Sequence, residues 1–313
     1  MSSQERVRDR RAFAVYKKDG LVSGGMDVVD AMTPRADLVT VPLPGGRKDA
    51  LQYLQEHQFS SVPVVKPTDD GEQFRGLVSR DDLIANPTED QLALLMREVP
   101  TVTPDTTVEA AAQVAHDEGV RRLPVVDPND DSDLLGIVTV TDVVDAVAHG
   151  EVETDATCAD VADEAVNTVY TEEPLTVAER QLTLAQVPYG VCLDDDCAVA
   201  GMLTEVDVLD AARIVEGEEE TGDSIADQDD DWKWESVKAI GSRYLPTRDV
   251  EVPSEPVSRF MTADVVSVYG AQTVREAAQE MIRNEVEQFP LMDGGDLVGV
   301  VRDVHVLEAV CHG

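Results

Sequence analysis

One sequence unit occurs four times along this chain of 313 residues. In each copy an apolar residue followed by proline leads, after a short hairpin, to a glycine and two apolar residues. The four proline and glycine pairs are separated by 13, 12, 13 and 9 residues, and they are Pro63 and Gly76, Pro124 and Gly136, Pro188 and Gly201, and Pro290 and Gly299. Four concordant copies at similar spacing indicate an internal repeat, and a repeat determines the fold.

The residues around each copy predict the order β-α-β-β-α, and therefore an α/β fold. In residues 107–115 the apolar positions return every three to four residues, which is helical spacing. The Val-Pro-Val-Val run at 62–65 is short and β-branched, as buried strands are, and residues 127–130 have the composition of a tight turn. A second helix follows the glycine strand, as at 143–147. Because one such unit is too small to bury both faces of a sheet, the units are expected to pair.

The lead-in Met32-Thr33-Pro34, the β-α-β-β-α order and the ending Gly-apolar-apolar-Thr-x-x-Asp together resemble the CBS (cystathionine β-synthase) domain. The lead-in recurs at Met96 and Met261, whereas repeat 3 has Val161-Ala162-Asp163 there. The resemblance covers residues 27–149 and 157–311. It implies that repeats pack in pseudo-symmetric pairs, called Bateman modules, whose clefts hold adenosine-containing ligands. In this respect the chain is similar to the AMP-sensing γ subunits of AMP-activated kinases.

The resemblance also implies a domain organisation. Repeats 1 and 2 are expected to form one module and repeats 3 and 4 a second, with the two modules stacked as a flat pseudo-symmetric disc. The expected boundaries are an N-terminal extension at 1–26, repeats at 27–86, 91–149, 157–213 and 254–311, and an acidic linker at 214–250. Within the linker, Glu216 to Asp231 is rich in Asp and Glu and is predicted to be solvated. Trp232 and Trp234 follow, and they either anchor the returning chain on the second module or form a docking patch for a partner.

The charge of the chain restricts the salt conditions in which the protein works and the classes of partner that it can bind. Asp and Glu number 63 against 25 Lys and Arg, so the formal net charge is −38 and the pI about 4.2. Such a chain repels itself in dilute salt, which predicts a protein of a salt-accumulating halophile. Nucleic acid and anionic membranes are excluded as partners on the same ground. The basic residues between Arg6 and Lys18 are expected to contact the acidic body of the protein.

The sequence shows no strong signal for a membrane protein, a secreted protein or a metal-binding protein. No stretch reaches the roughly 20 apolar residues of a membrane helix, and the first residues lack an apolar signal core, so a cytoplasmic location is expected. The four cysteines lack the paired spacing of a zinc site, and no metal is expected. Cys192 and Cys197 flank a predicted hairpin tip and could approach each other, although free thiols are the preferred interpretation.

The Ser/Thr-x-x-Asp ending has two interpretations. It matches a capping box at a helix start, which needs no ligand. The CBS resemblance implies instead that the carboxylate accepts hydrogen bonds from ribose hydroxyls, a role that suits an acceptor-only group. The three candidate ribose sites are Ser79 with Asp82, Thr139 with Asp142, and Thr204 with Asp207. In repeat 4 Arg302 and His305 stand at these positions, and this departure puts a fourth ribose site in doubt.

A nucleotide also needs donors for its phosphates. Arg121 and Arg122, directly before Leu123-Pro124, resemble the His-Arg-Leu-Pro-Val of the kinase γ subunits, which implies a phosphate contact. The alternative is a salt bridge to neighbouring Asp or Glu. Repeats 3 and 4 have no Arg or Lys there, so the first module is favoured. Thr40 and Thr103 match the family position that meets the nucleoside, although strand propensity explains a threonine equally well.

The sequence favours binding over catalysis. The histidines are scattered, and there is neither a Walker loop nor a dinucleotide fingerprint. We expect a non-enzymatic regulatory module that requires no cofactor, binds AMP, ADP or ATP in preference to NAD or S-adenosylmethionine, and signals to a regulated protein. The alternative is a scaffolding protein with vestigial ligand clefts. A monomer suffices for this architecture, and a homodimer through helical faces remains open.

Overall fold

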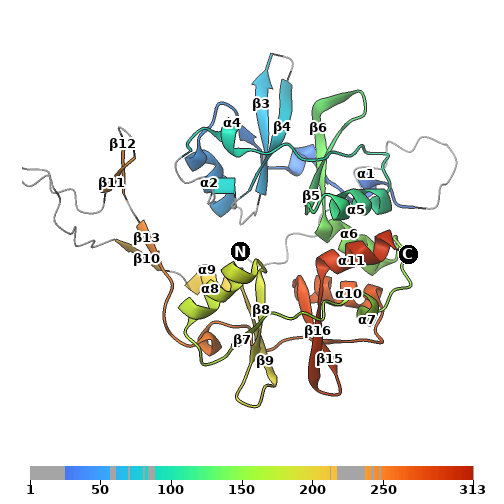
Figure 1. The fold of residues 1–313 in the computed structure, drawn as a ribbon. Helices are drawn as coiled ribbons and strands as arrows, with labels where there is room; N and C mark the ends of the chain where they lie inside the picture. The colour runs from blue at the N-terminus through green and yellow to red at the C-terminus, as the bar shows by residue number, and fades with distance from the viewer. Residues whose placement is uncertain are drawn as a thin grey trace, which may run out of the picture.

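The computed structural model describes residues 25–56, 61–69, 71–79, 82–83, 89–211, 213–216, 237–240, 243–246 and 248–312. Within these ranges the chain forms four three-stranded sheets, one for each repeat, with short helices beside them (Figure 1). The predicted α/β fold built from four repeats is therefore confirmed. No helix in these ranges is both long and apolar enough to cross a bilayer.

Repeat 2 shows how the sequence builds one unit. Helix α5 (Val108–Asp117) begins at Thr107, whose side chain accepts a hydrogen bond from the backbone N–H of Ala110. Strands β5 (Arg122–Asp127) and β6 (Asp130–Thr139) form the antiparallel hairpin predicted from the apolar runs and the turn between them. Helix α6 (Val140–His149) follows β6 without a loop and buries most of its valines and alanines.

The other repeats follow the same order of elements as far as the structure describes them. Repeat 1 contains β2 (Val41–Pro42), α2 (Arg47–Glu56), β3 (Ser61–Thr68) and β4 (Gly71–Ser79). Repeat 3 contains β7 (Thr168–Tyr170), α8 (Leu175–Ala185), β8 (Tyr189–Leu193), β9 (Val199–Thr204) and α9 (Glu205–Ala211). Repeat 4 contains β14 (Val268–Tyr269), α10 (Val274–Asn284), β15 (Gln288–Asp293), β16 (Asp296–Arg302) and α11 (Asp303–Cys311). The lead-ins begin with the short helical turns α1 (Val28–Ala31), α4 (Leu92–Leu95), α7 (Cys158–Val161) and η3 (Val257–Arg259).

Each lead-in crosses to the sheet of the other repeat in its module. Strand β1 (Thr33–Pro34), from the lead-in of repeat 1, pairs antiparallel with β6 of repeat 2. The exchange is reciprocal and recurs in the second module, with the pairs Thr33 and Ile137, Arg97 and Leu77, Asp163 and Val300, and Thr262 and Met202. The expected pairing of repeats 1 with 2 and 3 with 4 is confirmed by these four crossings.

The lead-in exchange explains the repeated glycine. A Cβ atom added at Gly136 would lie 2.7 Å from the carbonyl oxygen of Thr33, and one at Gly201 would lie 2.8 Å from that of Thr262. Carbon and oxygen atoms cannot approach so closely without displacing one of the two backbones. Glycine therefore recurs because the partner repeat's lead-in passes directly over it.

The two modules meet through repeats 2 and 4. Helices α5 and α6 pack against α10 and α11, and one apolar core runs across this contact, including Val144, Val147, Val306 and Ala309. Figure 1 shows the red helix α11 beside the green helices of repeat 2. Repeats 1 and 3 each have a separate, smaller core.

The region between repeats 3 and 4 contains secondary structure that sequence reasoning missed. Strand β10 (Arg213–Glu216) pairs antiparallel with β13 (Arg248–Glu251), and β11 (Val237–Ile240) pairs antiparallel with β12 (Arg243–Pro246). The predicted solvated stretch after Glu216, the two tryptophans and the N-terminal basic residues lie outside the described residues.

Candidate functional site

The three Ser/Thr-x-x-Asp endings lie where the last strand of a repeat passes into its final helix. In repeat 2 the backbone N–H and the hydroxyl of Thr139 both donate to Oδ2 of Asp142, at 2.8 and 2.7 Å. In repeat 3 Thr204 makes the same two bonds to Oδ2 of Asp207, each at 2.7 Å. In repeat 1 Ser79 makes them to Asp82, at 3.0 and 2.6 Å. The capping interaction is therefore present in all three copies, and it uses the same carboxylate oxygen each time.

The fourth copy keeps the cap with different chemistry. The backbone N–H of Arg302 donates to Nδ1 of His305 at 3.2 Å, so the imidazole replaces the carboxylate as acceptor. Nε2 of His305 then lies 3.2 Å from Oδ2 of Asp163, the lead-in residue of repeat 3. Burial lowers the pKa of His305, and the charge of Asp163 opposes this shift without cancelling it. Since Nδ1 accepts, the neutral ring carries its proton on Nε2 and donates it to Asp163.

A lead-in residue also contacts the capping residue in repeat 1, where the contact is an ion pair. Asp82 is buried, with only 5% of its side chain exposed, and its Oδ1 is bound by Nε of Arg97. Arg97 belongs to the lead-in of repeat 2 and crosses to the sheet of repeat 1 beside Leu77. Sequence reasoning noted the departure at Asp163 but gave Arg97 no role and missed the partners of both residues, because the crossing of the chains is a tertiary feature.

Arg121 forms an ion pair between the modules. Its Nη1 and Nη2 donate to Oδ1 and Oδ2 of Asp303 in repeat 4, at 3.1 and 2.5 Å, and Nη2 also lies 3.2 Å from Glu287. Burial lowers the pKa of Arg121, but the hydrogen bonds and charge of Asp303, together with Glu287, raise it overall. The salt-bridge interpretation of Arg121 therefore holds. Its partner lies 182 residues away, in another repeat, and so could not be found from local sequence.

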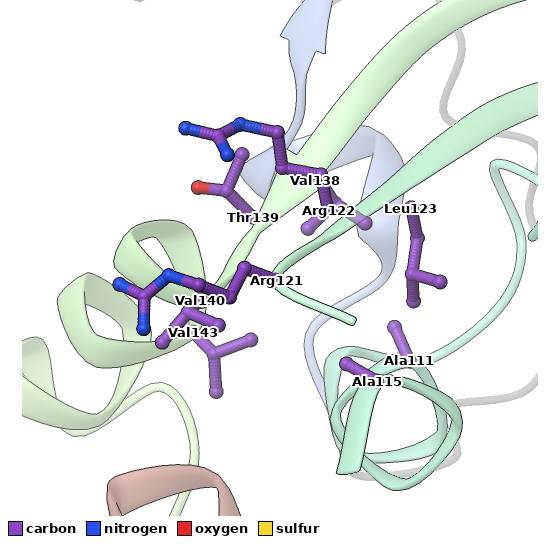
Figure 2. Close-up of a pocket in the computed structure, with 9 residues that line it drawn as sticks. All are labelled: Ala111, Ala115, Arg121, Arg122, Leu123, Val138, Thr139, Val140 and Val143. Atoms are coloured by element: carbon purple, nitrogen blue, oxygen red, sulfur yellow. The ribbon is translucent and has the colours of Figure 1, made fainter. Parts of the chain in front are cut away.

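Arg122 has a different environment. It lies opposite Thr139 in the β5 and β6 ladder, next to the start of α6. Burial and the neighbouring charge of Arg121 lower the pKa of Arg122, and the negative charges of Glu287 and Asp142 oppose the shift. Figure 2 shows the two arginine side chains extending to the same side, with the hydroxyl of Thr139 between them in this view.

A small apolar pocket opens beside these arginines (Figure 2). Its cavity volume is about 10 Å³, far below the roughly 300–1,000 Å³ of most small-molecule sites. As it stands, it has room for about one water molecule. The lining residues come from α5, β5, β6 and α6, and they are Ala111, Ala115, Arg121, Arg122, Leu123, Val138, Thr139, Val140 and Val143.

The two threonines predicted to meet the nucleoside make local hydrogen bonds. Thr40 accepts one from Nη2 of Arg35 at 3.3 Å. Thr103 donates to Asp105 at 2.5 Å, and its backbone N–H donates to Thr106. The bond of Thr40 links it to the short helical turn η2 (Arg35–Asp37), whereas those of Thr103 stabilise the turn that enters α5. The nucleoside contact of both residues stays a prediction.

The described side chains contain no group of three or more His, Cys, Asp or Glu that could hold a metal ion. All four cysteines are free thiols, so Cys192 and Cys197 are not joined at the hairpin tip. Burial raises the pKa of Cys192 to about 12, and the charges of Asp207 and Glu173 add to this effect. A thiol with so high a pKa is a poor nucleophile at neutral pH.

The CBS-domain family profile matches residues 27–88, 92–149 and 257–312, which is more than half of the chain. The chain belongs to the CBS-domain family. Repeat 3 lies outside the matched residues, although its elements follow the same order as those of its neighbours. Its lead-in also departs from the family pattern, because it has Val161-Ala162-Asp163 where the other lead-ins have methionine. Asp163 of this lead-in pairs with Val300 of repeat 4.

Two similar proteins come from Methanocaldococcus jannaschii. The uncharacterized protein MJ1404 is 24% identical over 274 residues, which are 88% of this chain and 60% of that protein. The crystal structure of MJ1225 from the same organism has a TM-score of 0.63 at 15% identity, over 90% of this chain and 99% of that one. An uncharacterized conserved protein from Pyrococcus horikoshii has the same TM-score at 24% identity, over 91% of this chain and 100% of that one. These likenesses show a shared fold along nearly the whole chain, which in sequence spans about 60% of MJ1404.

Proposed function

We propose that this CBS-domain protein is a non-catalytic regulatory module that binds an adenosine-containing ligand in its first module and signals to a partner protein. Family membership supports a regulatory role, and MJ1225, with the same fold, is described as a candidate archaeal homologue of the γ subunit of AMPK. The net charge of −38 supports a cytoplasm rich in salt and argues against nucleic acid and anionic membranes as partners.

The observation that carries the proposal is the set of side chains at the start of α6. Asp142 offers a carboxylate for ribose hydroxyls, Thr139 lies beside it, and Arg122 lies opposite Thr139 with a guanidinium suited to phosphate. The apolar pocket next to them (Figure 2) has a volume of only about 10 Å³, so we expect it to widen when the base enters. In a protein this acidic, a phosphate needs such a local cation, which favours AMP, ADP or ATP over S-adenosylmethionine, a ligand without phosphate.

The position of the site supports a mechanism for signalling. Arg122 is next in the chain to Arg121, and Arg121 is tied to Asp303 of the other module. A phosphate bound at Arg122 adds negative charge next to the Arg121–Asp303 ion pair. The ligand then favours one arrangement of the two modules by as much as its affinities for the arrangements differ.

Calorimetry with purified protein in multimolar KCl tests the proposal. Asp142→Ala should weaken adenosine, AMP and ATP alike, because each loses a charge-assisted hydrogen bond worth roughly 1.5–3 kcal/mol, or one to two decades in affinity. Arg122→Ala should weaken AMP and ATP by a similar factor and leave adenosine unchanged. His305→Ala, in the divergent fourth copy, is the matched control and should leave all three affinities unchanged at this site.

The scaffolding alternative rests on one observation: the caps and ion pairs account for every Ser/Thr–Asp pair without a ligand. It is the better account if none of AMP, ADP, ATP, NAD and S-adenosylmethionine binds below millimolar concentration. Equal losses of adenosine and AMP affinity on removing Arg122 would show that this residue braces the fold and does not contact phosphate.

A further inference from the structure

We infer that helix α8 of repeat 3 is a docking surface for a second copy of this chain, and that the ribbon of β11 and β12 of that copy occupies it. The inference concerns assembly, so it does not depend on the ligand proposed above. It joins two features that the proposed function leaves unused. One is an apolar stripe on the outside of α8, and the other is a basic and apolar ribbon that pairs with no further strand among the described residues.

The apolar stripe consists of two large side chains on the outside of α8. Val177 is 43% exposed and Leu184 is 70% exposed, whereas Leu175, Ala178 and Leu182 are buried in the core of repeat 3. Because Val177 and Leu184 are seven residues apart, they lie on the same side of the helix. This side faces away from the core of the repeat.

The equivalent helices of the other repeats lack this stripe. The four helices α2, α5, α8 and α10 can be compared residue by residue from their first positions. The six equivalent residues are small or charged, and they are Asp49, Ala110 and Glu276 at the position of Val177 and Glu56, Asp117 and Arg283 at that of Leu184. Single exposed apolar residues are common on proteins. A pair on one side of one helix, absent from three equivalent helices, indicates a contact that repeat 3 alone makes.

The charge of repeat 3 restricts what can dock there. Counted over residues 27–86, 91–149, 157–211 and 254–311, the formal charges of repeats 1 to 4 are −4, −8, −11 and −6. Repeat 3 is therefore the most acidic of the four, and Arg180 is its only Lys or Arg within these bounds. An occupant that combines apolar surface with positive charge is complementary to this surface.

The ribbon has this chemistry. In sequence, residues 232–248 contain four of the 25 Lys and Arg of the chain and one of its 63 Asp and Glu, so their charge is +3. They also contain both tryptophans, and aromatic residues are enriched at protein interfaces. The segment is the one strongly apolar and basic part of the long connection between repeats 3 and 4.

The register of the ribbon separates its residues into two faces. Because opposite residues of an antiparallel pair share a face, Val237, Ala239, Tyr244 and Pro246 belong to one face and Lys238, Ile240, Arg243 and Leu245 to the other. Neither face carries an acidic residue. A two-stranded ribbon alone is at best marginally stable in water, so this ribbon needs a surface to pack against.

The position of the ribbon favours a second copy as that surface. Figure 1 shows β11 and β12 standing apart from the four sheets, beyond the pair of β10 and β13. Strand β10 follows α9 almost directly in the chain, and α9 packs beside α8. The ribbon therefore leaves the body next to the surface that we assign to it. In a two-fold dimer each copy can place its ribbon on the α8 of the other, which makes the contact self-complementary.

Sedimentation equilibrium of the full chain in multimolar KCl tests the inference. The wild type should be a dimer. Leu184→Asp, which gives α8 the residue that α5 has at this position, should raise the dissociation constant of the dimer by roughly tenfold or more, because a buried leucine is lost from the contact. Lys238→Glu combined with Arg243→Glu should weaken the dimer in the same way from the side of the ribbon.

Leu94→Asp is the matched control. Leu94 is 65% exposed on α4, and the lead-ins of repeats 1 and 3 have Asp30 and Asp160 at the equivalent position. The substitution is the same and the exposure is similar, but Leu94 is not on α8. It should leave the dissociation constant unchanged, and thermal melts check that both aspartate variants are folded.

Chemical crosslinking identifies the occupant. In a Cys197→Ser background, which removes the exposed thiol, Leu184→Cys chains and Tyr244→Cys chains are treated with a short bismaleimide. The mixture should give crosslinked dimers, and either variant alone should give none. With both substitutions in one chain, the crosslink should again join two chains.

The opposite results overturn the inference. A monomeric wild type does so, as does a dimer that Leu184→Asp leaves intact or that Leu94→Asp weakens equally. Failure of the mixed chains to crosslink shows that the ribbon is not the occupant. A crosslink formed within single chains of the doubly substituted protein shows that the ribbon covers the α8 of its own chain.

Discussion

At the scale of single residues, His305 should make the stability of the protein depend on pH. Burial holds its folded-state pKa below the ordinary value of 6.5, so the unfolded chain binds the proton more readily than the folded one. Acidification through that value therefore favours unfolding, and the contribution of His305 is fully present only above it. We expect the free energy of unfolding to fall between about pH 7.5 and about pH 5, as urea denaturation at each pH will measure.

The control for this prediction is His305→Asn. The amide oxygen of asparagine can still accept from the N–H of Arg302, but the side chain cannot be protonated. The variant should lose part of the pH dependence and keep most of the stability at neutral pH. A slope identical to that of the wild type would show that the carboxylates alone set the response to acid.

Single residues also mark how far the sequence could predict the site. The Ser/Thr-x-x-Asp spacing predicted the caps, because a cap is made by neighbours in the chain. The partners of Asp82, Arg121 and His305 could not be predicted, because each comes from another repeat through a chain crossing or a contact between modules. The departure of the repeat 3 lead-in at Asp163 was the available signal for His305, and the sequence analysis gave no such signal for Arg97.

At the scale of elements, the crossing of a lead-in over a glycine should limit what the strand tolerates. Gly136→Ala places a methyl group 2.7 Å from the carbonyl oxygen of Thr33 and 2.7 Å from Sδ of Met32. The methionine can move, but the backbone of β1 has to shift and weaken its pairing with β6. We expect a loss of about 1–3 kcal/mol in the free energy of unfolding, measured by urea denaturation.

Gly46→Ala is the matched control. Its nearest neighbour would be the carbonyl oxygen of Asp90 at 3.5 Å, an ordinary van der Waals distance. The loss there should be smaller than at Gly136, and a gain is expected if alanine suits the start of α2. Equal effects at the two positions would mean that backbone freedom, and not the close approach of β1, accounts for the glycine at 136.

The elements themselves were largely predictable. The Val-Pro-Val-Val run at 62–65 became part of β3 and the Leu-Pro-Val-Val run at 123–126 part of β5, and the amphipathic run after Thr107 became α5. The strands β10 to β13 were missed, since the acidic composition around them masks any alternation of apolar residues. The first strands of repeats 1 and 4 are short, because only two residues of each of β2 and β14 pair with a neighbouring strand.

At the scale of the whole molecule, the sequence predicted which repeats pair but not which repeats join the modules. The pairing follows from the small size of one unit and from the family resemblance. The contact between repeats 2 and 4 depends on how the apolar faces of α5, α6, α10 and α11 fit together, and periodicity alone does not give such complementarity. The ion pair of Arg121 with Asp303 lies at this contact.

This ion pair should couple the two modules energetically. A double-mutant cycle of Arg121→Ala and Asp303→Ala, followed by urea unfolding, should give an interaction energy of about 0.5–3 kcal/mol. Arg121→Ala alone should cost more than Asp303→Ala alone. The carboxylate of Asp303 is 93% buried and would be left unpaired, whereas Arg121 is 42% exposed and keeps Glu287 and water.

The exposed pair of Arg283 with Glu280, within α10, is the control, and its double-mutant cycle should give an interaction energy of about 0.2–0.5 kcal/mol. Equal interaction energies in the two cycles would mean that apolar packing alone joins the modules.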